Sequence, residues 1–409
     1  MKNLLILTYA GLGERHRVGA PTFWKTTEGF VAAGWKVWVV DIGTKEDTPL
    51  GERDYGDGLY IIRFNPPFLK QERKKKIGWF FGLANTAWMT QKLKSEAERL
   101  IREKGLTKEN TVVYALETNA VRAGKAVSQK HQMPLVTRFY GTAMCDKPYS
   151  LYYRLRDYPS FQALRTKADF VLMTNDGTKG DQVLARVHNP SKDQVFWRNG
   201  VNYPESDGII LPEIEEKIAG KPVIQTLCRL NRWKHVDRAV SAMSGVLEKC
   251  PDAMLVVCGY GPEQEALEEQ ARRENVADHV IFTGGLKHEH AIAYMKRANL
   301  FLSLYDLSNL GNPLFEAMRC GKAIITLDVG ATNTVIENNK NGILLSLDEL
   351  PELPDVICRL LKNDKERKML EEGALRYADE NFWTWDERVA AEIQKVDALL
   401  GKNKNGEKT

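Results

Sequence analysis

The sequence predicts an α/β protein built from two Rossmann-like, doubly wound parallel-sheet domains that face a cleft. Short apolar runs alternate with longer amphipathic stretches along almost the whole chain. The runs are apolar on both faces, as are the strands of a parallel sheet that helices cover on each side. At 409 residues the chain is also too long for a single ordinary core, so two domains are expected.

The expected strands form two series, separated by a break at Pro204–Pro212. The first series comprises Leu4–Tyr9, Lys36–Asp41, Tyr60–Phe64, Thr111–Ala115, Leu135–Phe139, Phe170–Met173 and Gln194–Trp197. The second comprises Val223–Cys228, Met254–Cys258, Val280–Thr283, Leu300–Leu304, Ala323–Thr326 and Gly342–Leu345. The helical period between strands is clearest where one apolar face is formed by Val236, Ala239, Val240, Met243 and Val246.

The break also sets the expected domain boundaries. Residues 1–205 are expected to form the N-terminal domain and residues 206–384 the C-terminal domain, with a linker near 204–220. The polar stretch 403–409 is expected to be a disordered tail. Ligands of such sheets bind beyond the carboxyl ends of the strands, so the cleft between the domains is the first place to look for a site.

Composition indicates an ordinary soluble protein, with 43% hydrophobic and 27% charged residues. The net charge of +4 is too small to argue for a nucleic-acid partner. The six cysteines show no zinc spacing and are expected to be buried, reduced thiols. No apolar run approaches the ~20 residues of a membrane span. The apolar start is followed by Arg15, His16 and Arg17 without a cleavage site, so we expect a buried strand rather than a signal peptide, and a cytoplasmic protein.

The strongest local signal is the segment Arg229–Lys234, which follows the first strand of the second series. Two cations on a loop at the carboxyl end of a strand can neutralise a diphosphate and stabilise it as a leaving group. The alternative is a solvated basic loop. The position of the loop at the first strand–helix junction of its domain, together with the motifs downstream, favours the diphosphate interpretation.

Two further strand–helix junctions carry turn and ligand signals. Gly259 and Gly261 allow a tight turn before Pro262, and a structural turn and a ligand loop are equally plausible there. Gly311 precedes a helix whose N-terminal N–H groups would suit phosphate. Glu316, about one turn into that helix, can accept two ribose hydroxyls, or it can simply complement the helix dipole.

Several sequence motifs of other enzyme classes are absent or incomplete. The glycines Gly11, Gly13 and Gly19 form a loop before a helix near Pro21, but they do not match GxGxxG, which disfavours a nicotinamide dinucleotide. The sequence has no DxD pair, histidine cluster or GxSxG elbow, so we expect neither a metal nor another cofactor.

A basic segment beside aromatics suits an anionic membrane surface, where each cation adds ~1 kcal/mol. The alternatives are a solvated loop with its aromatics packed inward and, less favoured, a nucleic-acid patch. The segment comprises Lys70, Arg73, Lys74, Lys75, Lys76, Trp79, Phe80 and Phe81.

Taken together, the motifs in the second half of the chain resemble those of the retaining GT-B glycosyltransferases of glycosyltransferase family 4. The family's Arg and Lys after the first C-domain strand appear at Arg229 and Lys234, and its Glu-x7-Glu signature aligns to Ser308–Glu316 with Gly311 in place. Four more segments match the family in the same order along the chain: Asn199–Asn202 before the linker, the turn Gly259–Pro262, the strand end Phe282–Leu286, and Phe382–Trp385. The last of these looks like the start of a helix, at about 385–402, that crosses back to the N-terminal domain.

The resemblance implies roles for individual residues. Arg229 and Lys234 would hold the diphosphate of a nucleotide-sugar donor and Glu316 its ribose. Further donor contacts would come from Gly19, Gly261, Gly284, Leu286, Ser308, Gly311, Asn312, Pro313 and Leu314. Asn119 and Tyr140 would lie on the acceptor side. The expected enzyme is a metal-independent, retaining glycosyltransferase that moves a sugar to a glycan or lipid-linked hydroxyl, in cell-envelope polysaccharide or glycoconjugate synthesis.

Two positions depart from the family pattern. Ser308 replaces the first acid of the Glu-x7-Glu pair, and Asp306 is the candidate substitute. Tyr140 stands where related enzymes commonly place a histidine. Two alternatives stay open: a non-catalytic homologue that binds a sugar nucleotide as a partner subunit and, less favoured, a sugar-nucleotide epimerase.

Overall fold

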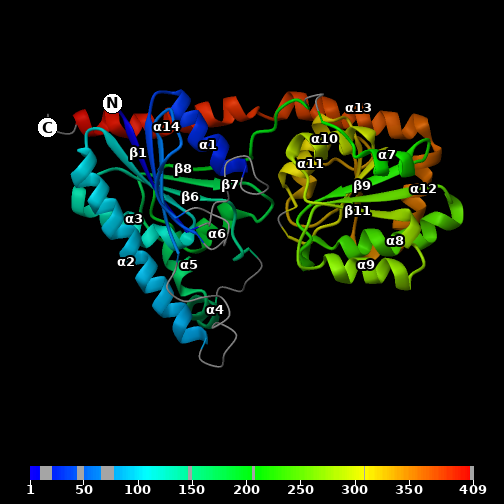
Figure 1. The fold of residues 1–409 in the computed structure, drawn as a ribbon, viewed down its shortest axis with the longest axis horizontal. Coiled ribbons are helices and arrows are strands. Elements are labelled where there is room, and N and C mark those ends of the chain that lie inside the picture. The colour runs from blue at the N-terminus through cyan, green and yellow to red at the C-terminus, as the bar shows by residue number, and fades with distance from the viewer. Residues whose placement is uncertain are drawn as a thin grey trace. The chain divides into compact units, whose positions relative to one another are not determined.

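The computed structural model describes residues 1–9, 21–43, 50–65, 78–145, 150–204, 208–307 and 309–405. The chain divides into two compact units, and Figure 1 labels many of their helices and some of their strands. The first unit holds residues 1–175, 180–198 and 385–409, and the second holds residues 176–179 and 199–384. The sequence placed the domain boundary at 205. The structure places it between Arg198 and Asn199 and assigns four residues of the first half, Asp176–Lys179, to the second unit.

The first unit contains an eight-stranded sheet in the order β3-β4-β2-β1-β5-β6-β7-β8. Its strands are β1 (Asn3–Thr8), β2 (Lys36–Ile42), β3 (Gly51–Asp54), β4 (Leu59–Phe64), β5 (Thr111–Leu116), β6 (Leu135–Phe139), β7 (Phe170–Thr174) and β8 (Gln194–Trp197). Every predicted strand of the first series is present, with ends within one residue of those predicted. The prediction of a wholly parallel sheet was wrong at one edge, because β3 pairs antiparallel with β4. All four residues of β3 are exposed, so the strand carries no apolar signal.

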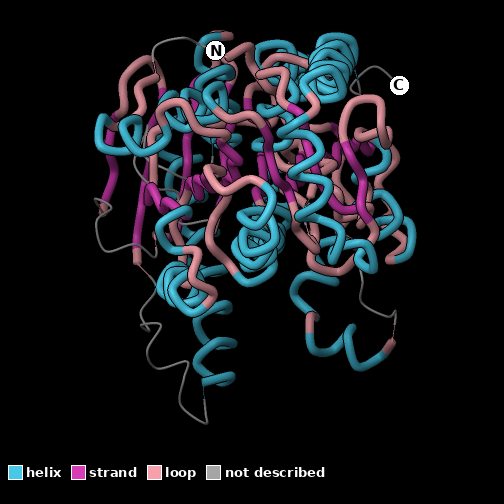
Figure 2. Tube along the Cα trace, turned by 90° about the vertical axis from the view of Figure 1, so that its right-hand side faces the viewer, coloured by secondary structure: helices cyan, strands magenta, loops and turns pink. Residues whose placement is uncertain are grey.

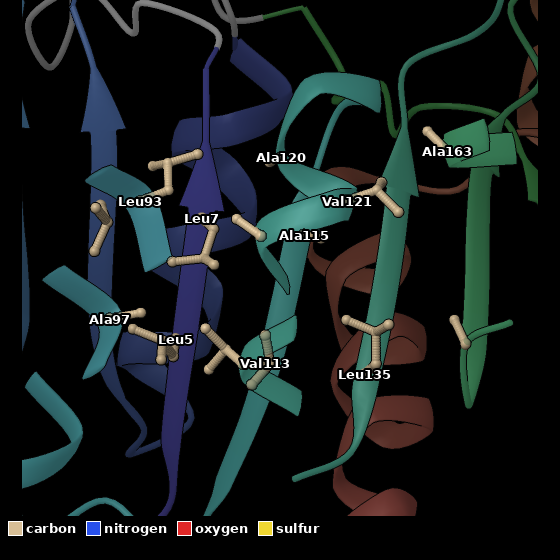
Figure 3. Close-up of a cluster of buried hydrophobic side chains, with 14 of the residues drawn as sticks. Leu5, Leu7, Leu93, Ala97, Val113, Ala115, Ala120, Val121, Leu135 and Ala163 are labelled. Atoms are coloured by element: carbon tan, nitrogen blue, oxygen red, sulfur yellow. The ribbon is translucent and has the colours of Figure 1, made fainter. Parts of the chain in front are cut away.

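Helices cover both faces of this sheet, as predicted. They are α1 (Pro21–Ala32), α2 (Gly78–Lys104), α3 (Thr118–His131), α4 (Leu151–Arg156), α5 (Tyr158–Leu164), α6 (Gly180–Arg186) and α14 (Trp385–Asn405). Figure 3 shows Leu5 and Leu7 of β1 packed beside Leu93 of α2, within the core that α2, α3, α5 and α6 build on one face. The intervening residues Leu4 and Ile6 pack against α1 and α14 on the other face. Strand β1, near the middle of the sheet, is thus buried on both sides.

The closing helix differs from its predicted length. It begins at Trp385, as expected, but continues to Asn405. Residues 403–405, assigned from composition to a disordered tail, are therefore helical. The last four residues lie outside the described part of the chain.

The second unit contains a six-stranded sheet in the order β11-β10-β9-β12-β13-β14, in which every pairing is parallel. Its strands are β9 (Val223–Leu227), β10 (Met254–Cys258), β11 (Val280–Gly284), β12 (Leu300–Ser303), β13 (Ala323–Leu327) and β14 (Ile343–Leu345). All six were predicted to within one residue. In the tube view of Figure 2 the strands, in magenta, run between layers of helices in cyan.

The helices of this unit also form two layers. The core on one face includes residues of α8 (Val236–Lys249), α9 (Gln264–Arg273) and α12 (Leu353–Lys362). The cores on the other face include residues of α7 (Pro212–Ile218), α10 (His288–Arg297), α11 (Asn312–Arg319) and α13 (Asp364–Asn381). Helix α7 lies inside the segment predicted as a linker. Its Ile214 and Ile218 are buried in the unit, an apolar pair that the surrounding prolines and charges obscured.

Strand β9 is the topological switch point of the second sheet. Its neighbours β10 and β12 lie on opposite sides, and the chain leaves β9 toward one and returns to the other. The register of β9 with β12 comprises only Leu300 with Ile224 and Phe301 with Gln225. Ligands of doubly wound sheets bind at the carboxyl side of such a switch point. The loops after β9 and β12 are therefore the place to examine.

Candidate functional site

The loop after β9 is compact and presents two cations. Leu230 is fully buried and anchors the loop, whereas Arg229 beside it is exposed. Within the described residues the Arg229 side chain forms no ion pair or hydrogen bond. A short 3-10 helix (Arg232–Lys234) follows, and His235 ends it in the left-handed region with φ 45°. The sequence therefore places Arg229 and Lys234 on one tight turn at the switch point.

The glycine turn after β10 lies against this loop. The Leu230 N–H donates to the Tyr260 carbonyl at 3.0 Å, and the Glu263 N–H donates to the Leu230 carbonyl at 3.1 Å. A Cβ atom on Gly261 would lie 2.4 Å from the Leu230 oxygen, and one on Gly259 only 1.8 Å from the Cys228 oxygen. Because both clashes are with backbone, neither can be relieved by a rotamer change. Glycine is therefore required at both positions, because only glycine lets the two loops pack this closely. Their contact fixes the backbone that carries Arg229.

Lys234 is partly withdrawn from solvent. Its ammonium nitrogen lies 4.1 Å from the centre of the Tyr305 ring. Burial lowers the pKa of Lys234, while Cys228 and Asp176 act in the opposite direction. Burial in turn raises the pKa of the Cys228 thiol to about 11 and that of Tyr305 well above its usual value, so both groups are neutral near pH 7. A cation in such a place gains strongly from an anionic partner.

Asp306, the candidate substitute for the acid missing at 308, is already engaged. Its carboxylate lies 2.7 Å from Arg238 Nη1 and 2.6 Å from His235 Nε2. Its N–H donates to the Trp233 carbonyl at 3.3 Å. These contacts fasten the loop after β12 to the turn that carries Lys234. Ser308 itself lies outside the described residues.

Helix α11 begins as the sequence predicted, with Gly311 as the N-cap residue and Pro313 in the first turn. Asn312 accepts a hydrogen bond from Asn199 Nδ2 at 2.9 Å, which joins the Asn199–Asn202 element to the helix start. Leu314 is buried in the core, so its side chain anchors the helix and only its backbone could serve a ligand. Phosphate groups are favoured at helix N-termini of this kind.

Glu316 has a partner that sequence reasoning missed. His288 Nε2 lies 2.9 Å from Glu316 Oε1, and the two side chains are 70% and 12% exposed. His288 opens α10, two residues after Leu286 at the end of the β11 connection. Gly284 in turn pairs with Gly259, whose N–H donates to the Gly284 carbonyl at 3.0 Å. Apart from Ser308, the predicted donor residues of the second unit therefore lie on loops joined by direct contacts along one edge of the sheet.

The two predicted acceptor residues belong to the first unit. Asn119 is exposed in the first turn of α3. The Tyr140 N–H donates to Glu117 Oε1 at 2.7 Å, and the Arg138 guanidinium carbon lies 5.2 Å from the Tyr140 ring centre. Burial raises the pKa of Tyr140, so its phenol stays protonated. Glu117, which the sequence did not single out, has φ 69° and ψ 158°, a conformation that is essentially confined to glycine.

The remaining sequence predictions concern the N-terminal glycine loop, the basic segment, the cysteines, metal ions and membrane spans. Gly19 and residues 70–76 lie outside the described part, so the donor contact and the membrane surface predicted there stay predictions. No disulfide joins any of the six cysteines. Within the described ranges there is no group of three or more His, Cys, Asp or Glu side chains suited to a metal ion, and no helix with the length and apolarity of a membrane span.

The match to a known family lies within the second unit. Residues 210–376 match the family described as Glycosyl transferases group 1. An uncharacterized glycosyltransferase of Methanocaldococcus jannaschii is 29% identical over 233 residues, 56% of this chain and 58% of that protein. The GDP-mannose-dependent alpha-(1-6)-phosphatidylinositol monomannoside mannosyltransferase of Mycobacterium tuberculosis is 29% identical over 192 residues, 45% and 49% of the two chains. The chain thus spans about half the length of these relatives.

The likeness in fold extends much further than the likeness in sequence. Sucrose-phosphate synthase from Thermosynechococcus elongatus superposes with a TM-score of 0.76 at 17% identity, over 98% of this chain and 100% of that one. This similarity establishes the GT-B class, in which both halves are Rossmann-like α/β domains.

Proposed function

We propose that this chain is a retaining glycosyltransferase that moves a sugar from a nucleotide-diphosphate sugar to a hydroxyl of a glycan or lipid-linked acceptor. The family match of residues 210–376 and the GT-B fold support this assignment. Both relatives compared above bear the name of a glycosyltransferase, and one is named for a GDP-mannose donor and a phosphatidylinositol mannoside acceptor.

The observation that carries the proposal is the cation pair at the switch point of the second sheet. Arg229 extends from a turn that Gly259 and Gly261 hold rigid, and the Lys234 ammonium stands over Tyr305 in a desolvated position. Two cations on a rigid loop suit a diphosphate better than two cations on a mobile surface loop, because the backbone that carries them is already organised in folding. The N-terminus of α11 adds backbone N–H donors and the positive end of the helix dipole, both of which favour a phosphate group.

In the proposed reaction the diphosphate is the leaving group. Arg229 and Lys234 stabilise the negative charge that develops on it, and Glu316 accepts hydrogen bonds from the ribose. The bond from the anomeric carbon to the diphosphate oxygen breaks, and the acceptor oxygen bonds to the anomeric carbon on that same face, so the configuration is retained. The departing diphosphate oxygen takes the proton of the acceptor hydroxyl. The two side-chain cations supply the positive charge that a metal ion would otherwise supply to the diphosphate, so we propose metal-independent transfer.

Replacement of either cation tests the assignment. Arg229→Ala and Lys234→Ala should each lower kcat/KM for donor by two to three orders of magnitude, by analogy with the ~3–4 kcal/mol of a lost oxyanion donor. Arg232→Ala, which removes an exposed cation from the same turn, is the matched control and should stay within a few-fold of the parent. Transfer should also persist in EDTA. Near-parental rates for both alanine variants would refute the proposal.

The donor can be identified without knowing the acceptor. A ligand that binds only the folded state stabilises it by RT ln(1 + [L]/Kd), so at equal concentration the tighter-binding ligand raises the unfolding temperature more. UDP-, GDP- and ADP-sugars should therefore be compared by thermal shift at equal concentration, and the responding donor tested for the anomeric configuration of its product by NMR. A product of inverted configuration would contradict the retaining mechanism.

A further inference from the structure

The loops at the carboxyl edge of the second sheet are linked one to the next. The loop after β9 bonds to the turn after β10 through Leu230, and that turn bonds to the end of β11 through Gly259. The loop after β12 bonds back to the loop after β9 through Asp306. The pair of His288 with Glu316 joins the β11–α10 connection to α11. The first two links are hydrogen bonds between backbone groups, whereas this pair is made by side chains and so depends on the residue types.

The hydrogen bond of this pair runs from the histidine to the carboxylate. Nε2 of His288 lies 2.9 Å from Oε1 of Glu316. An ionised carboxylate can only accept hydrogen bonds, so the imidazole must carry a proton on Nε2. A neutral ring protonated at Nε2 meets this requirement, and so does the imidazolium ion. The contact therefore engages one oxygen of Glu316 in either form of the ring.

The second oxygen of Glu316 keeps its capacity to accept. The Glu316 side chain is 12% exposed, so it is packed on most sides, whereas His288 is 70% exposed. Within the described part of the chain, no other hydrogen bond or ion pair reaches the Glu316 carboxylate. The thiol of Cys320, one turn further along α11, is neutral near pH 7, because burial raises its pKa to about 12. The carboxylate is thus held at Oε1 and open at Oε2.

A carboxylate held in this way can distinguish a ribose from a deoxyribose. A hydrogen bond to a charged group is stronger than one between neutral groups, and it weakens steeply when the donor is misaligned. A carboxylate that is already oriented also avoids the cost of ordering a mobile side chain when the ligand binds. Without His288, the Glu316 side chain would gain rotamer freedom and lose part of this selectivity.

We propose that His288 is a positioning residue of the donor site, which holds Glu316 so that its open oxygen accepts a hydroxyl of the donor's ribose. The pair thereby selects ribonucleoside diphosphate sugars over their deoxyribose counterparts. The inference rests on the proposed function, which assigns Glu316 to the ribose. It adds a second residue, from a different element of the fold, on which recognition of the pentose depends.

The test compares ribose with deoxyribose ligands in variants of His288. Dissociation constants are measured by isothermal titration calorimetry for UDP, GDP and ADP and for the 2′-deoxy and 3′-deoxy form of each. For the nucleotide that binds most tightly, loss of the recognised hydroxyl should raise the dissociation constant of the parent by about tenfold or more. In His288→Ala this ratio should fall to about threefold or less, because the ribose ligand loses affinity and the deoxyribose ligand does not.

Three further variants separate positioning from folding. His288→Gln keeps a side-chain N–H donor and should retain most of the ratio. Glu289→Gln changes the next side chain in the first turn of α10 and should leave the ratio at its parental value. Glu316→Ala should abolish the ratio, and adding His288→Ala to it should change the ratio no further, because the two side chains act through one hydrogen bond. Since His288 is exposed, its replacement is expected to leave the fold intact.

The outcomes separate this inference from the proposed function. If Glu316→Ala abolishes the ratio while His288→Ala keeps it, the role of His288 is refuted and the role of Glu316 stands. If His288→Ala weakens the ribose and deoxyribose ligands equally, His288 is only structural and the inference is again refuted. If the parent binds both kinds of ligand alike, the inference fails, whereas loss of transfer in Lys234→Ala would still support the glycosyltransferase assignment. Parental transfer by both Arg229→Ala and Lys234→Ala would refute the assignment itself.

Discussion

Two regions of the molecule use charge in different ways: the proposed site of the second unit and two buried ion pairs of the first. In the second unit the cations of the proposed site lie at the carboxyl edge of the sheet, with Arg229 exposed and unengaged by the residues that the structure describes. In the first unit two buried pairs of opposite charge are satisfied within the protein: Arg388 with Glu392 at 3.0 Å and Arg63 with Asp41 at 2.7 Å, all nearly inaccessible to solvent. The difference teaches how to tell the two roles apart. A charge that serves the fold is satisfied by the protein, whereas a charge that serves a ligand is left with capacity to bind it.

The pair formed by Arg388 and Glu392 of α14 shows the structural role most fully. Glu392 accepts hydrogen bonds from the Tyr114 hydroxyl of β5 and from Arg388. Arg388 Nε donates to the Arg198 carbonyl at 3.1 Å, just after β8. The closing helix is thereby tied to the first sheet through a buried polar network, in addition to its apolar contacts through Val396 and Leu399.

The largest expected effect on stability comes from breaking this network. Glu392→Gln leaves the Arg388 guanidinium buried without its counter-charge, which costs about 3–5 kcal/mol of unfolding free energy. Glu337→Gln, which breaks an exposed pair with Lys340, is the control and should cost about 0–1 kcal/mol. Urea unfolding followed by circular dichroism measures both. If both variants lose a similar, small amount of unfolding free energy, the buried pair stabilises the fold no more than the exposed pair, and the distinction between them is wrong.

A smaller effect on stability, accompanied by lost donor binding, is expected in the second unit. Gly261→Ala places a methyl group 2.4 Å from the Leu230 oxygen, so the turn that carries Arg229 must shift. Overpacking of this kind costs about 1–3 kcal/mol, and the shift should weaken binding of the donor identified by thermal shift. Gly401→Ala, where a Cβ meets nothing within 4 Å, is the control for the substitution itself. Unchanged donor affinity in Gly261→Ala would mean that the glycine turn does not position Arg229.

The sequence alone predicted nearly all of the fold. Buried parallel strands are short, continuous apolar runs, and this signal located all but one of the strands in the described part of the chain. Strand β3, with the sequence Gly-Glu-Arg-Asp, was missed because an exposed edge strand has no apolar pattern. Helix α7 was mistaken for a linker because only Ile214 and Ile218 face the core. Both errors come from elements whose formation depends on their neighbours rather than on their own composition.

The site was predictable only where its residues are near one another in sequence. Arg229 and Lys234 share one loop, and Gly311 and Glu316 share one helix, so their spacing carries the signal. The pairing of His288 with Glu316 joins elements far apart in the chain. No spacing rule relates such residues. The strain at Glu117 is likewise a property of the backbone and not of the residue type.

That strain leads to the smallest predicted effect, which compares the two ends of one helix in the first unit. Glu117 precedes α3 with φ 69° and ψ 158°, and Gln132 follows it with φ 53° and ψ 30°. The first conformation is essentially confined to glycine, whereas the second is the ordinary left-handed cap of a helix. Glycine should therefore be more stable than alanine at both positions, with a gap of about 1–3 kcal/mol at 117 and about 1 kcal/mol at 132. Comparing Gly with Ala cancels the lost hydrogen bond to Tyr140, since neither side chain can accept it. Urea unfolding of the four variants measures the two gaps. Equal gaps would show that Glu117 stores no special strain, and a larger gap at 117 would identify the carboxyl edge of the first sheet as a place where this protein sacrifices stability to hold a carboxylate in position.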